Sequence, residues 1–514
     1  MKLRLAQKNG GMHMRVLVNS TQMKKCDSNT IQHYGVPSLV LMERAALGVV
    51  EEVEKQNLSN NNILVVCGSG NNGGDGFAIG RILSQRGYKV TFVLAGYKEK
   101  ASAETKQQIK ICLMYGANIL DAIPDMEYGA VIDAVFGIGV NREIQGNYYK
   151  IIQQMNQLRA WKVAVDIPSG IHTDTGEVMG IAFQADMTVT FAFEKIGIMI
   201  YPGAAYAGKV VVKDIGIGKE SFLEEKCTTY CLEKSDIFKV PKRLNYSNKG
   251  TYGKVLVVAG HKNMAGAAFF SGKSAYATGA GLVKVYTEET NRTIIQELLP
   301  EAVLETYEAK SEIEKTLLDS LSWASVVVAG PGIGTDEVSE HMIRIILENA
   351  KVPVILDADG LNIVSHHKEW LRERNMPLIV TPHLGEMARL TEKSIFDIQK
   401  QLLQVAGEFA KEYNVICVLK DARTVIALPD GTTFINTSGN NGMATAGAGD
   451  VLTGVIAGLL AQKMEPMQAA PLGVYLHGTG ADWMVEKTGT YGMMAQDIIE
   501  GIRQVLKEID KEGI

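Results

Sequence analysis

Apolar and polar residues follow one another in blocks along this chain, and the blocks predict strands and helices in turn. In the first part, short runs rich in Val, Ile and Phe are separated by segments with apolar residues at helical spacing. This alternation is typical of a parallel sheet covered by helices. We expect strands at residues 62–67, 89–95, 130–136, 161–167 and 187–193, and helices at residues 38–53, 75–86 and 103–114.

The alternation lapses after about residue 218, where a charged stretch shows no clear strand, and it resumes near residue 252. The expected fold class is therefore α/β, with two domains that are each a doubly wound, mainly parallel sheet. We place the first domain at residues 14–218, a linker at 219–235 and the second domain at 236–510. Strands of the second domain are expected within residues 252–260, 324–332, 352–360, 377–383 and 415–421.

Composition narrows the class of protein. The chain has 514 residues, 46% of them hydrophobic and 21% charged, which is ordinary for a soluble globular protein. A net charge of −5 leaves no basic footprint for nucleic acid or an anionic membrane, and no apolar run approaches the roughly 20 residues of a membrane span. The basic N-terminus lacks the apolar core of a signal peptide, and residues 1–13 could be an extension before Met14. Six scattered cysteines without metal-site spacing favour a reducing, cytoplasmic location.

A glycine-rich loop follows the first expected strand, in the sequence CGSGNNGGDGF at residues 67–77. Its spacing matches the weak dinucleotide signature GxGxxG, and the start of the following helix offers backbone N–H groups to an anion. An ordinary dehydrogenase is disfavoured because the next strand lacks an acidic residue at its tip for a ribose hydroxyl. A plain strand-to-helix turn would not need Asn71, Asn72 and Asp75. The loop therefore fits a phosphate-bearing ligand.

Polar side chains also follow three expected strands of the first domain. Asn72, Asp133, Asp166 and Ser169 lie at or just after strand ends, which share one edge of a parallel sheet. A single Asp at such a place is often a helix or loop cap. Several oxygen donors without Cys or His suit a hard cation instead.

The motifs NNGGDGF, VIDAVFGIG, VDIPSGIHTDTG and TVTFAFEKIG together resemble the NAD(P)H-hydrate epimerase family over residues 14–218. The resemblance implies a Rossmann-like domain whose substrate is hydrated NADH or NADPH. It implies that K+ is held by Asn72, Asp133 and Ser169, and that Asp166 contacts the hydrated ring. The substrate contacts it implies are Asn71, Asn72, Gly73, Gly74, Asp75, Gly137, Ile138, Gly139, Val140, Asn141, Arg142 and Glu143.

Epimerising a hydroxyl-bearing ring carbon needs either proton transfer or C–O cleavage followed by re-addition of water. A carboxylate facing the ring can serve as acid and base in turn. Asp166 is the expected catalytic residue, with Lys195 as a possible helper.

The second domain has its clearest signal in GNNGMATAGAGDVLTGVIAGLLA, residues 439–461. A loop of small residues ends at Gly447 and opens a long apolar helix, whose first N–H groups can hold a phosphoryl group. Asp450 stands where it could take a proton from a hydroxyl. The alternative is an Asp that only caps a buried helix.

GAGD before such a helix resembles the ribokinase-like fold, and YGKVLVVAGHKNMAGAA, AGPGIG, LDADGLN and TPHLGEMARL narrow the resemblance to ADP/ATP-dependent NAD(P)H-hydrate dehydratase over about residues 236–510. It implies that Asp450 acts on the hydrate and that Mg2+ accompanies the nucleotide. The family usually reads Lys-Gly where this chain has Lys420-Asp421, and an added carboxylate disfavours a polyphosphate. The implied substrate contacts are Ala268, Gly332, His383 and Asp450, and the implied nucleotide contacts are Lys420, Asp421, Ala422, Arg423, Thr424 and Gly449.

Together these motifs predict a bifunctional repair enzyme. The first domain would interconvert R and S hydrates, and the second would dehydrate the S form with ADP or ATP. Phosphorylation of the ring hydroxyl would create a good leaving group, for which an anion hole and a kinase-type Asp are suited. The alternative is a ribokinase-type small-molecule kinase with a regulatory nucleotide-binding N-terminal domain. We expect only small-molecule substrates, no nucleic-acid or membrane partner, and a homo-oligomer.

Overall fold

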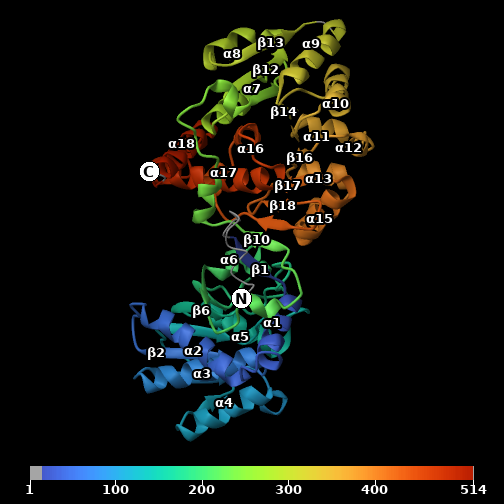
Figure 1. The fold of residues 1–514 in the computed structure, drawn as a ribbon. Helices are drawn as coiled ribbons and strands as arrows, with labels where there is room; N and C mark the ends of the chain where they lie inside the picture. Colours follow the sequence, from blue (N-terminus) through green and yellow to red (C-terminus); the bar gives the residue numbers. More distant parts are fainter. Residues whose placement is uncertain (1–13, 309, 513–514) are drawn as a thin grey trace. The chain divides into compact units, whose positions relative to one another are not determined.

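The computed structural model describes residues 14–308 and 310–512, so the possible extension at residues 1–13 lies outside the described residues. The described chain divides into two compact units (Figure 1). The N-terminal unit is Val16–Cys227, and the C-terminal unit begins at Thr228 and includes Arg15. Among the described residues, none of the helices has the length and apolar character that a membrane crossing requires.

The N-terminal unit is built on a parallel sheet with the strand order β4-β3-β2-β5-β6-β7-β9. The five strands predicted for this half are confirmed, since each expected apolar run contains one. Outside this sheet, β1 pairs in parallel with β8, with Leu17 opposite Glu194. The strands are β1 (Arg15–Val18), β2 (Asn62–Cys67), β3 (Lys89–Leu94), β4 (Ile119–Leu120), β5 (Ala130–Ala134), β6 (Trp161–Val165), β7 (Met187–Phe191), β8 (Glu194–Lys195) and β9 (Lys209–Lys213).

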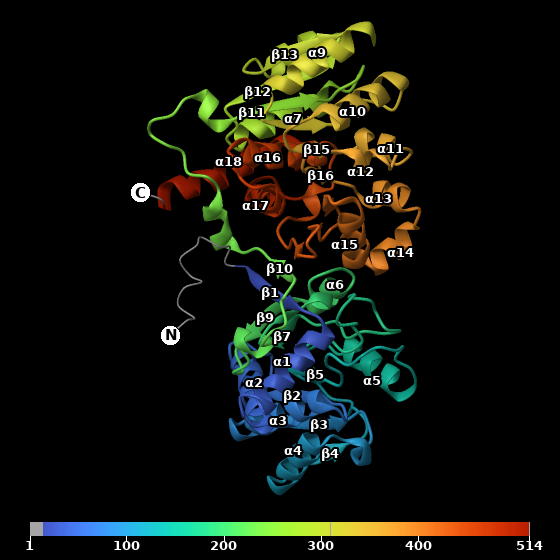
Figure 2. The same ribbon diagram turned by 45° about the vertical axis from the view of Figure 1, so that its right-hand side comes forward.

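Helices lie on both faces of this sheet, as Figure 2 shows for α3 and α5. One of them begins earlier than predicted: α3 starts at Asn71 rather than Asp75, because Gly70 is the N-cap and the paired glycines are already helical. The helices are α1 (Ser20–Gln32), α2 (Ser38–Glu54), α3 (Asn71–Gln85), α4 (Ala103–Met114), α5 (Gly146–Gln157) and α6 (Gly203–Ala207).

The C-terminal unit has the strand order β13-β12-β11-β14-β15-β16-β17-β18-β19-β10. Its pairs are parallel up to β17, and β18 then turns back as an antiparallel strand. The strands are β10 (Thr229–Cys231), β11 (Lys254–Val258), β12 (Leu282–Glu288), β13 (Val303–Tyr307), β14 (Val326–Ala329), β15 (Val354–Leu356), β16 (Leu378–Val380), β17 (Ile416–Leu419), β18 (Val425–Ala427) and β19 (Thr433–Ile435).

The stretch that was expected to lack a strand contains β10, so this detail of the prediction was wrong. β10 is a polar-looking segment that runs parallel to β19, and Tyr230 packs against Phe434 with their ring centroids 6.0 Å apart. Its stability comes from a partner strand some 200 residues away in sequence, which a local pattern does not reveal.

Helices cover both faces of the C-terminal sheet. They are α7 (Ala265–Ala277), α8 (Arg292–Leu298), α9 (Lys310–Trp323), α10 (Glu337–Asn349), α11 (Asp359–Val364), α12 (Trp370–Glu373), α13 (Leu384–Thr391), α14 (Ile395–Lys400), α15 (Leu402–Tyr413), α16 (Ala448–Ala461), α17 (Pro466–Thr488) and α18 (Ala495–Glu512).

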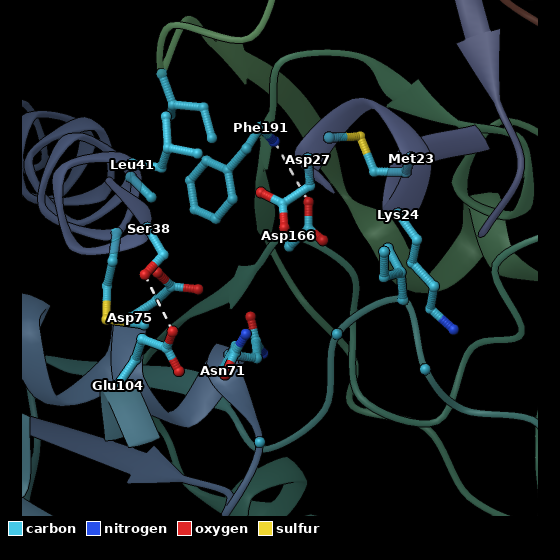
Figure 3. Close-up of a pocket in the computed structure, with 18 of the residues that line it drawn as sticks. Met23, Lys24, Asp27, Ser38, Leu41, Asn71, Asp75, Glu104, Asp166 and Phe191 are labelled. Atoms are coloured by element: carbon cyan, nitrogen blue, oxygen red, sulfur yellow. Dashed lines mark hydrogen bonds between the residues drawn. The ribbon is translucent and has the colours of Figure 1, made fainter. Parts of the chain in front are cut away.

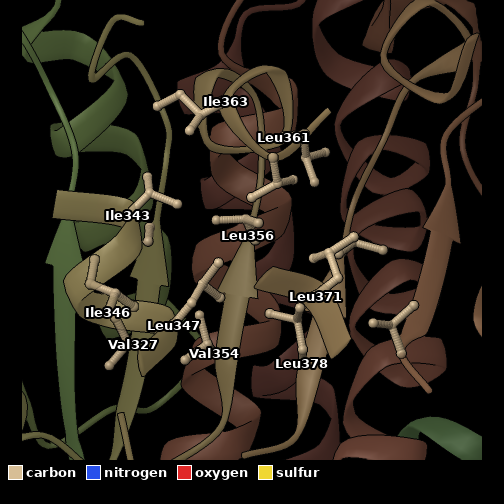
Figure 4. Packing of buried hydrophobic residues seen from close by; sticks show 14 of the residues in the cluster. Val327, Ile343, Ile346, Leu347, Val354, Leu356, Leu361, Ile363, Leu371 and Leu378 are labelled. Atoms are coloured by element: carbon tan, nitrogen blue, oxygen red, sulfur yellow. The ribbon is translucent and has the colours of Figure 1, made fainter. Parts of the chain in front are cut away.

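Two hydrophobic layers hold this unit together. Along β11, Leu256 and Val258 belong to one layer and Val255 and Val257 to the other, because successive side chains of a strand point to opposite faces. The first layer packs under the helices from α9 to α15, part of which Figure 4 shows, and the second packs under α7, α16 and α17. Burial on both faces explains why these strands read as nearly continuous apolar runs.

Strand order reverses once in each parallel sheet. In the N-terminal unit the reversal lies between β2 and β5, and in the C-terminal unit between β11 and β14. Loops at the carboxyl ends of strands diverge at such a switch point and leave a crevice, which is where open α/β sheets bind ligands.

Candidate active sites

A cavity of about 490 Å³ opens in the N-terminal unit beside the switch point (Figure 3). Every residue that lines it belongs to this unit. The structure thus brings together side chains from the start of α3, the loop after β5 and the loop after β6. The predicted site residues in its lining are Asn71, Asn72, Asp75, Gly137, Ile138, Gly139, Val140, Asp166 and Lys195.

Other predicted contacts lie outside this lining. Gly73 and Gly74 are buried, and their lack of a side chain serves packing: an added Cβ would come 1.8 Å from the Gly68 carbonyl oxygen at Gly73, and 2.6 Å from Met42 Cε at Gly74. The last three residues of the predicted substrate loop are exposed on the surface and do not line the cavity: Asn141, Arg142 and Glu143.

Asp166 is held in place by several donors. Its Oδ1 accepts hydrogen bonds from Lys195 Nζ at 2.5 Å, Thr190 Oγ1 at 3.1 Å and the Phe191 N–H at 3.3 Å. The backbone of Asp166 has a φ of 69°, a strained conformation for a residue that is not glycine. Lys195 is fully buried, so the ion pair compensates a charge that would otherwise be costly. The other carboxylate oxygen of Asp166 accepts none of these bonds.

Asp75 lies just after the first turn of α3 and does not cap the helix, since Gly70 is the N-cap and has no side-chain cap bond. Burial, together with the nearby charges of Asp166 and Asp27, holds the pKa of Asp75 well above its usual range. Asp75 therefore favours the neutral acid, which removes the electrostatic cost of an Asp beside a phosphate group.

The predicted cation ligands form a buried oxygen-rich group. Asp133 accepts hydrogen bonds from the Ser169 N–H at 2.7 Å, Ser169 Oγ at 2.6 Å and the Val135 N–H at 3.2 Å. Asp133 is fully buried, and burial raises its pKa to about 6. Asn72 lies against Gly137 in the adjoining loop, and its buried Nδ2 makes no hydrogen bond. A buried carboxylate with no basic partner among the described contacts, surrounded by amide and hydroxyl groups, fits a hard cation.

The sequence analysis missed the part of the cavity formed by helices. α1 contributes Met23, Lys24 and Asp27, and Ser38 and Glu104 add a hydrogen-bonded pair with Ser38 Oγ 3.0 Å from Glu104 Oε1. These residues stand in segments without glycine-rich motifs. For α1, the local signal is an amphipathic helix with Asn19 as its cap.

In the C-terminal unit, α16 begins as the sequence predicted. Gly447 precedes the helix with a φ of 87°, and no side chain caps its first N–H groups. Asp450 lies in the first turn. Burial is the main cause that raises the pKa of Asp450 to about 7; Asp357 adds to the effect and Lys420 opposes it. The chain therefore provides an uncapped helix start beside a carboxyl whose pKa suits a general base.

Lys420, predicted as a nucleotide contact, forms an ion pair with Asp357, with Nζ 2.7 Å from Oδ1. Asp357 is 2% exposed, and it follows β15 in the DADG motif. Gly449 adjoins this pair: an added Cβ would lie 3.5 Å from Lys420 Nζ and 3.7 Å from Asp357 Oδ2. Lys420, Gly449 and Asp450 are thereby brought to one place, and Asp357 joins them as a residue that the sequence analysis had not selected.

His383 is the N-cap of α13. Its Nδ1 accepts hydrogen bonds from the N–H groups of Gly385 at 2.9 Å and Glu386 at 3.3 Å. Burial, with Lys420 and Arg389, lowers the pKa of His383, which favours the neutral ring that can accept these bonds. Glu386 completes the capping box, and burial raises its pKa to about 7. His383 thus has a structural role on Nδ1, while the side chain stays 55% exposed.

The remaining predicted contacts fall into two groups. Ala268 on α7 is fully buried, and Gly332 is buried with a φ of 60°. The other group forms the turn between β17 and β18, where Asp421 Oδ1 accepts a hydrogen bond from the Ala422 N–H at 2.8 Å. The Asp421 carboxylate therefore accepts a hydrogen bond within its own turn. The same turn contains Arg423 and Thr424.

Comparison with known proteins gives a match in each half of the chain. Residues 38–197 match the family model described as "YjeF-related protein N-terminus". Residues 255–504 match the family model described as "NAD(P)H-hydrate dehydratase". The first match covers most residues around the N-terminal cavity but not those of α1, and the second covers the cluster around Asp450.

Curated relatives match almost the whole chain. A protein of Moorella thermoacetica named "Bifunctional NAD(P)H-hydrate repair enzyme" is 36% identical over 519 residues, which is 96% of this chain and 97% of the relative. A protein of Escherichia coli with the same name is 33% identical over 449 residues, covering 86% of this chain and 84% of the relative.

A solved structure resembles the C-terminal part. It is described as a ribokinase-like superfamily protein from Enterococcus faecalis, with 27% identity, a TM-score of 0.50, and coverage of 55% of this chain and 96% of that one. The fold and the sites therefore define a two-domain α/β protein with a Rossmann-like N-terminal part and a ribokinase-like C-terminal part. The chain belongs to the family of bifunctional NAD(P)H-hydrate repair enzymes.

Proposed function

We propose that this chain repairs hydrated NADH and NADPH in two steps. The N-terminal unit interconverts the R and S hydrates, and the C-terminal unit dehydrates the S form to NAD(P)H with ADP or ATP. The observation that carries this proposal is the pair of separate sites: Asp166 in a cavity of one unit, and Asp450 at an uncapped helix start of the other. The relatives named for this repair activity span both sites.

In the N-terminal unit, the start of α3 would receive the substrate phosphates, and Asp166 would act at the hydrated ring. Lys195 fixes the orientation of the Asp166 carboxylate, leaving one oxygen available to exchange a proton with the ring hydroxyl or with water. Asn72, Asp133 and Ser169 would hold K+, which would neutralise negative charge beside the phosphate groups.

In the C-terminal unit, Asp450 would take the proton of the ring hydroxyl as that oxygen attacks a phosphoryl group. The free N–H groups of α16 would stabilise the charge on the transferring group. Loss of phosphate from C6 and of a proton from C5 would then form the C5=C6 double bond and restore the dihydronicotinamide. Mg2+ would arrive with the nucleotide and neutralise its phosphates. The residues proposed to bind the nucleotide are Lys420, Asp421, Ala422, Arg423, Thr424 and Gly449, and those proposed to bind the hydrate are Ala268, Gly332 and His383.

The same proposal assigns residues 14–218 to the epimerase, 219–235 to the linker and 236–510 to the dehydratase. The boundary between the two compact units falls after Cys227, inside the proposed linker. The kinase alternative is not favoured, because the relatives that span both halves carry the repair name.

We also propose a cytoplasmic homo-oligomer. The apolar side of α2 is buried within its own unit, where Gly48 packs against Lys213. A subunit contact would therefore use other surfaces, and light scattering during gel filtration would measure the mass.

Recovery of reduced-nicotinamide absorbance tests the repair proposal. The full chain is added to a mixture of R and S NADPH hydrates with Mg2+, K+ and either ADP or ATP. We expect the whole mixture to be recovered, and the nucleotide that works identifies the phosphoryl donor. Recovery of the S portion alone, with R lost only at the spontaneous rate, would contradict the epimerase assignment. No recovery with either nucleotide would contradict the dehydratase assignment.

A further inference from the structure

α1 brings a second carboxylate into the N-terminal cavity. Asp27 lines the cavity together with Asp166, and in Figure 3 the two side chains lie next to each other. Within the described contacts, the Asp27 carboxylate has neither a hydrogen bond nor an ion pair, whereas Asp166 is bonded to Lys195. The two carboxylates thus share a cavity but differ in their partners.

The position of Asp27 is fixed by the anchoring of its helix. At the N-terminal end of α1, Ser20 donates through its N–H and Oγ to the two oxygens of Asp174, at 2.6 and 3.0 Å. Near the other end, Asn29 Nδ2 donates to the Ser221 carbonyl oxygen at 2.8 Å. A side chain on a helix anchored at both ends is held in place before substrate binds, which is what catalysis requires.

The charges around Asp27 favour a proton on its carboxyl group. Burial is the main cause that raises the pKa of Asp27, followed by the charges of Asp166 and Glu104. Asp75 on α3 also faces the Asp27 carboxyl group. Two cations line the cavity: Lys24 on α1, and Lys195, which is bonded to Asp166. An unpaired carboxyl among other carboxyls stabilises nothing in the fold. Two carboxyl groups with such different surroundings in one site are typical of a catalytic pair, in which one group acts as the general acid and the other as the general base.

We propose that Asp27 is a second catalytic residue of the epimerase, the acid that protonates the departing ring hydroxyl while Asp166 acts as the base. This inference rests on the function proposed above for the N-terminal unit.

The step balances without any further reactant. The C6–O bond breaks as the ring nitrogen forms a double bond to C6, and the oxygen takes the bonding pair and the Asp27 proton to leave as water. C6 is then planar, so water can add to either face. Addition re-forms the C–O bond, returns the electron pair to nitrogen and passes a proton to Asp166. The neighbouring Asp27 regains that proton from Asp166.

The test compares Asp27→Asn, Asp27→Glu and the wild-type full chain on the same R and S hydrates with nucleotide and Mg2+. We expect Asp27→Asn to recover the S portion at the wild-type rate and to slow R conversion by roughly a hundred-fold or more. Recovery of the S portion also shows that the C-terminal site is intact. Because the acid works in its protonated form, wild-type epimerisation should decline as pH rises past the Asp27 pKa. Asp27→Glu should keep this decline, and Asp27→Asn should lose it.

Asp125→Asn is the matched control, since Asp125 is an exposed carboxylate of the same unit outside the cavity. In water labelled with heavy oxygen, the wild type should place the label in both hydrates. R conversion by Asp27→Asn at the wild-type rate, an unchanged pH decline in that variant, or epimerisation without label would each overturn the role of Asp27. If the wild type itself leaves the R hydrate unconverted, the proposed epimerase function is what fails.

Discussion

Several charged groups of the C-terminal unit are largely removed from solvent. Asp357 and Lys420 compensate each other across 2.7 Å, while Asp450 has no hydrogen bond to its carboxyl group within the described contacts. Removing a charge from water is costly unless a partner replaces the water. The Asp357 carboxylate therefore has a cationic partner, whereas the Asp450 carboxyl group has no hydrogen-bonded partner among the described residues. The pKa of Asp450 lies near neutral pH, where a general base is most effective.

Replacing Asp450 should lower the dehydration activity but raise the thermal stability at pH 8. Asp450→Asn should lower dehydration of the S hydrate roughly a hundred- to ten-thousand-fold, because the base is gone. In the wild type, dehydration should fall below about pH 7, where Asp450 gains a proton. The folded pKa lies above the unfolded one, so an ionised Asp450 destabilises the fold increasingly between acid and neutral pH. Asp450→Asn should therefore melt at a higher temperature than wild type at pH 8, as calorimetry would show.

The comparison at low pH is the control for that prediction. The melting difference should shrink under acid conditions, where Asp450 is neutral in both folded and unfolded chains. A variant that retains full dehydration activity would contradict the role of Asp450.

Breaking the buried ion pair should have the opposite effect on stability. Lys420→Met leaves Asp357 buried without its cation, and we expect a loss of about 3–5 kcal/mol in the free energy of unfolding. The double variant Lys420→Met with Asp357→Asn should recover much of the loss, because it removes the stranded charge. Urea unfolding of the single and double variants measures the difference. Equal stability of the single variant and wild type would show that water reaches Asp357.

Helix packing places the proposed base. α16 lies so close to α7 that Gly454 faces Ser271 and Ser274: an added Cβ would come 2.1 Å from the Ser271 carbonyl oxygen and 2.0 Å from Ser274 Oγ. Contacts this short leave room only for hydrogen. The small residues of the motif that opens α16 thus continue into the helix and fix its distance from α7.

Gly454→Ala should push α16 away from α7. We expect a loss of about 1–3 kcal/mol of stability from overpacking, together with lower dehydration activity, since Asp450 is on the same helix. Gly407→Ala on α15 is the matched control, because nothing lies within 4 Å of its added Cβ. That change should be neutral or stabilising by up to about 1 kcal/mol, as expected for alanine in a helix. Equal melting temperatures for the two variants would contradict the close packing of α7 and α16.

The sequence predicted the strands that are buried on both faces, since apolar runs such as residues 62–67 need no knowledge of distant partners. It also predicted the motifs at strand ends, where Asp166 and Ser169 follow β6 directly. It missed β10, which depends on β19, and it missed Asp27, which a helix brings to the cavity from outside the sheet. Tertiary packing places such residues, and neither the spacing of apolar residues nor the composition of the sequence reveals that packing.

The whole molecule joins two sites that are each complete within one unit. The N-terminal cavity is lined only by residues of the N-terminal unit, and Asp357, Lys420 and Asp450 all belong to the C-terminal unit. Fusion therefore ensures equal amounts of the two activities, and the proposed chemistry requires no residue from the other unit.

Two single-site variants should accordingly complement each other in one solution. Asp166→Asn alone should recover the S hydrate and leave R to spontaneous epimerisation, because its base is missing. Asp450→Asn alone should interconvert the hydrates and recover almost none. A mixture of the two, at the wild-type concentration of each intact site, should recover the whole mixture at close to the wild-type rate, because the released S hydrate diffuses to the second site. Reduced-nicotinamide absorbance over time gives the recovery in all three cases, and chromatographic separation of the two hydrates gives their interconversion by Asp450→Asn. A mixture much slower than the wild type would show that the two sites must act within one chain.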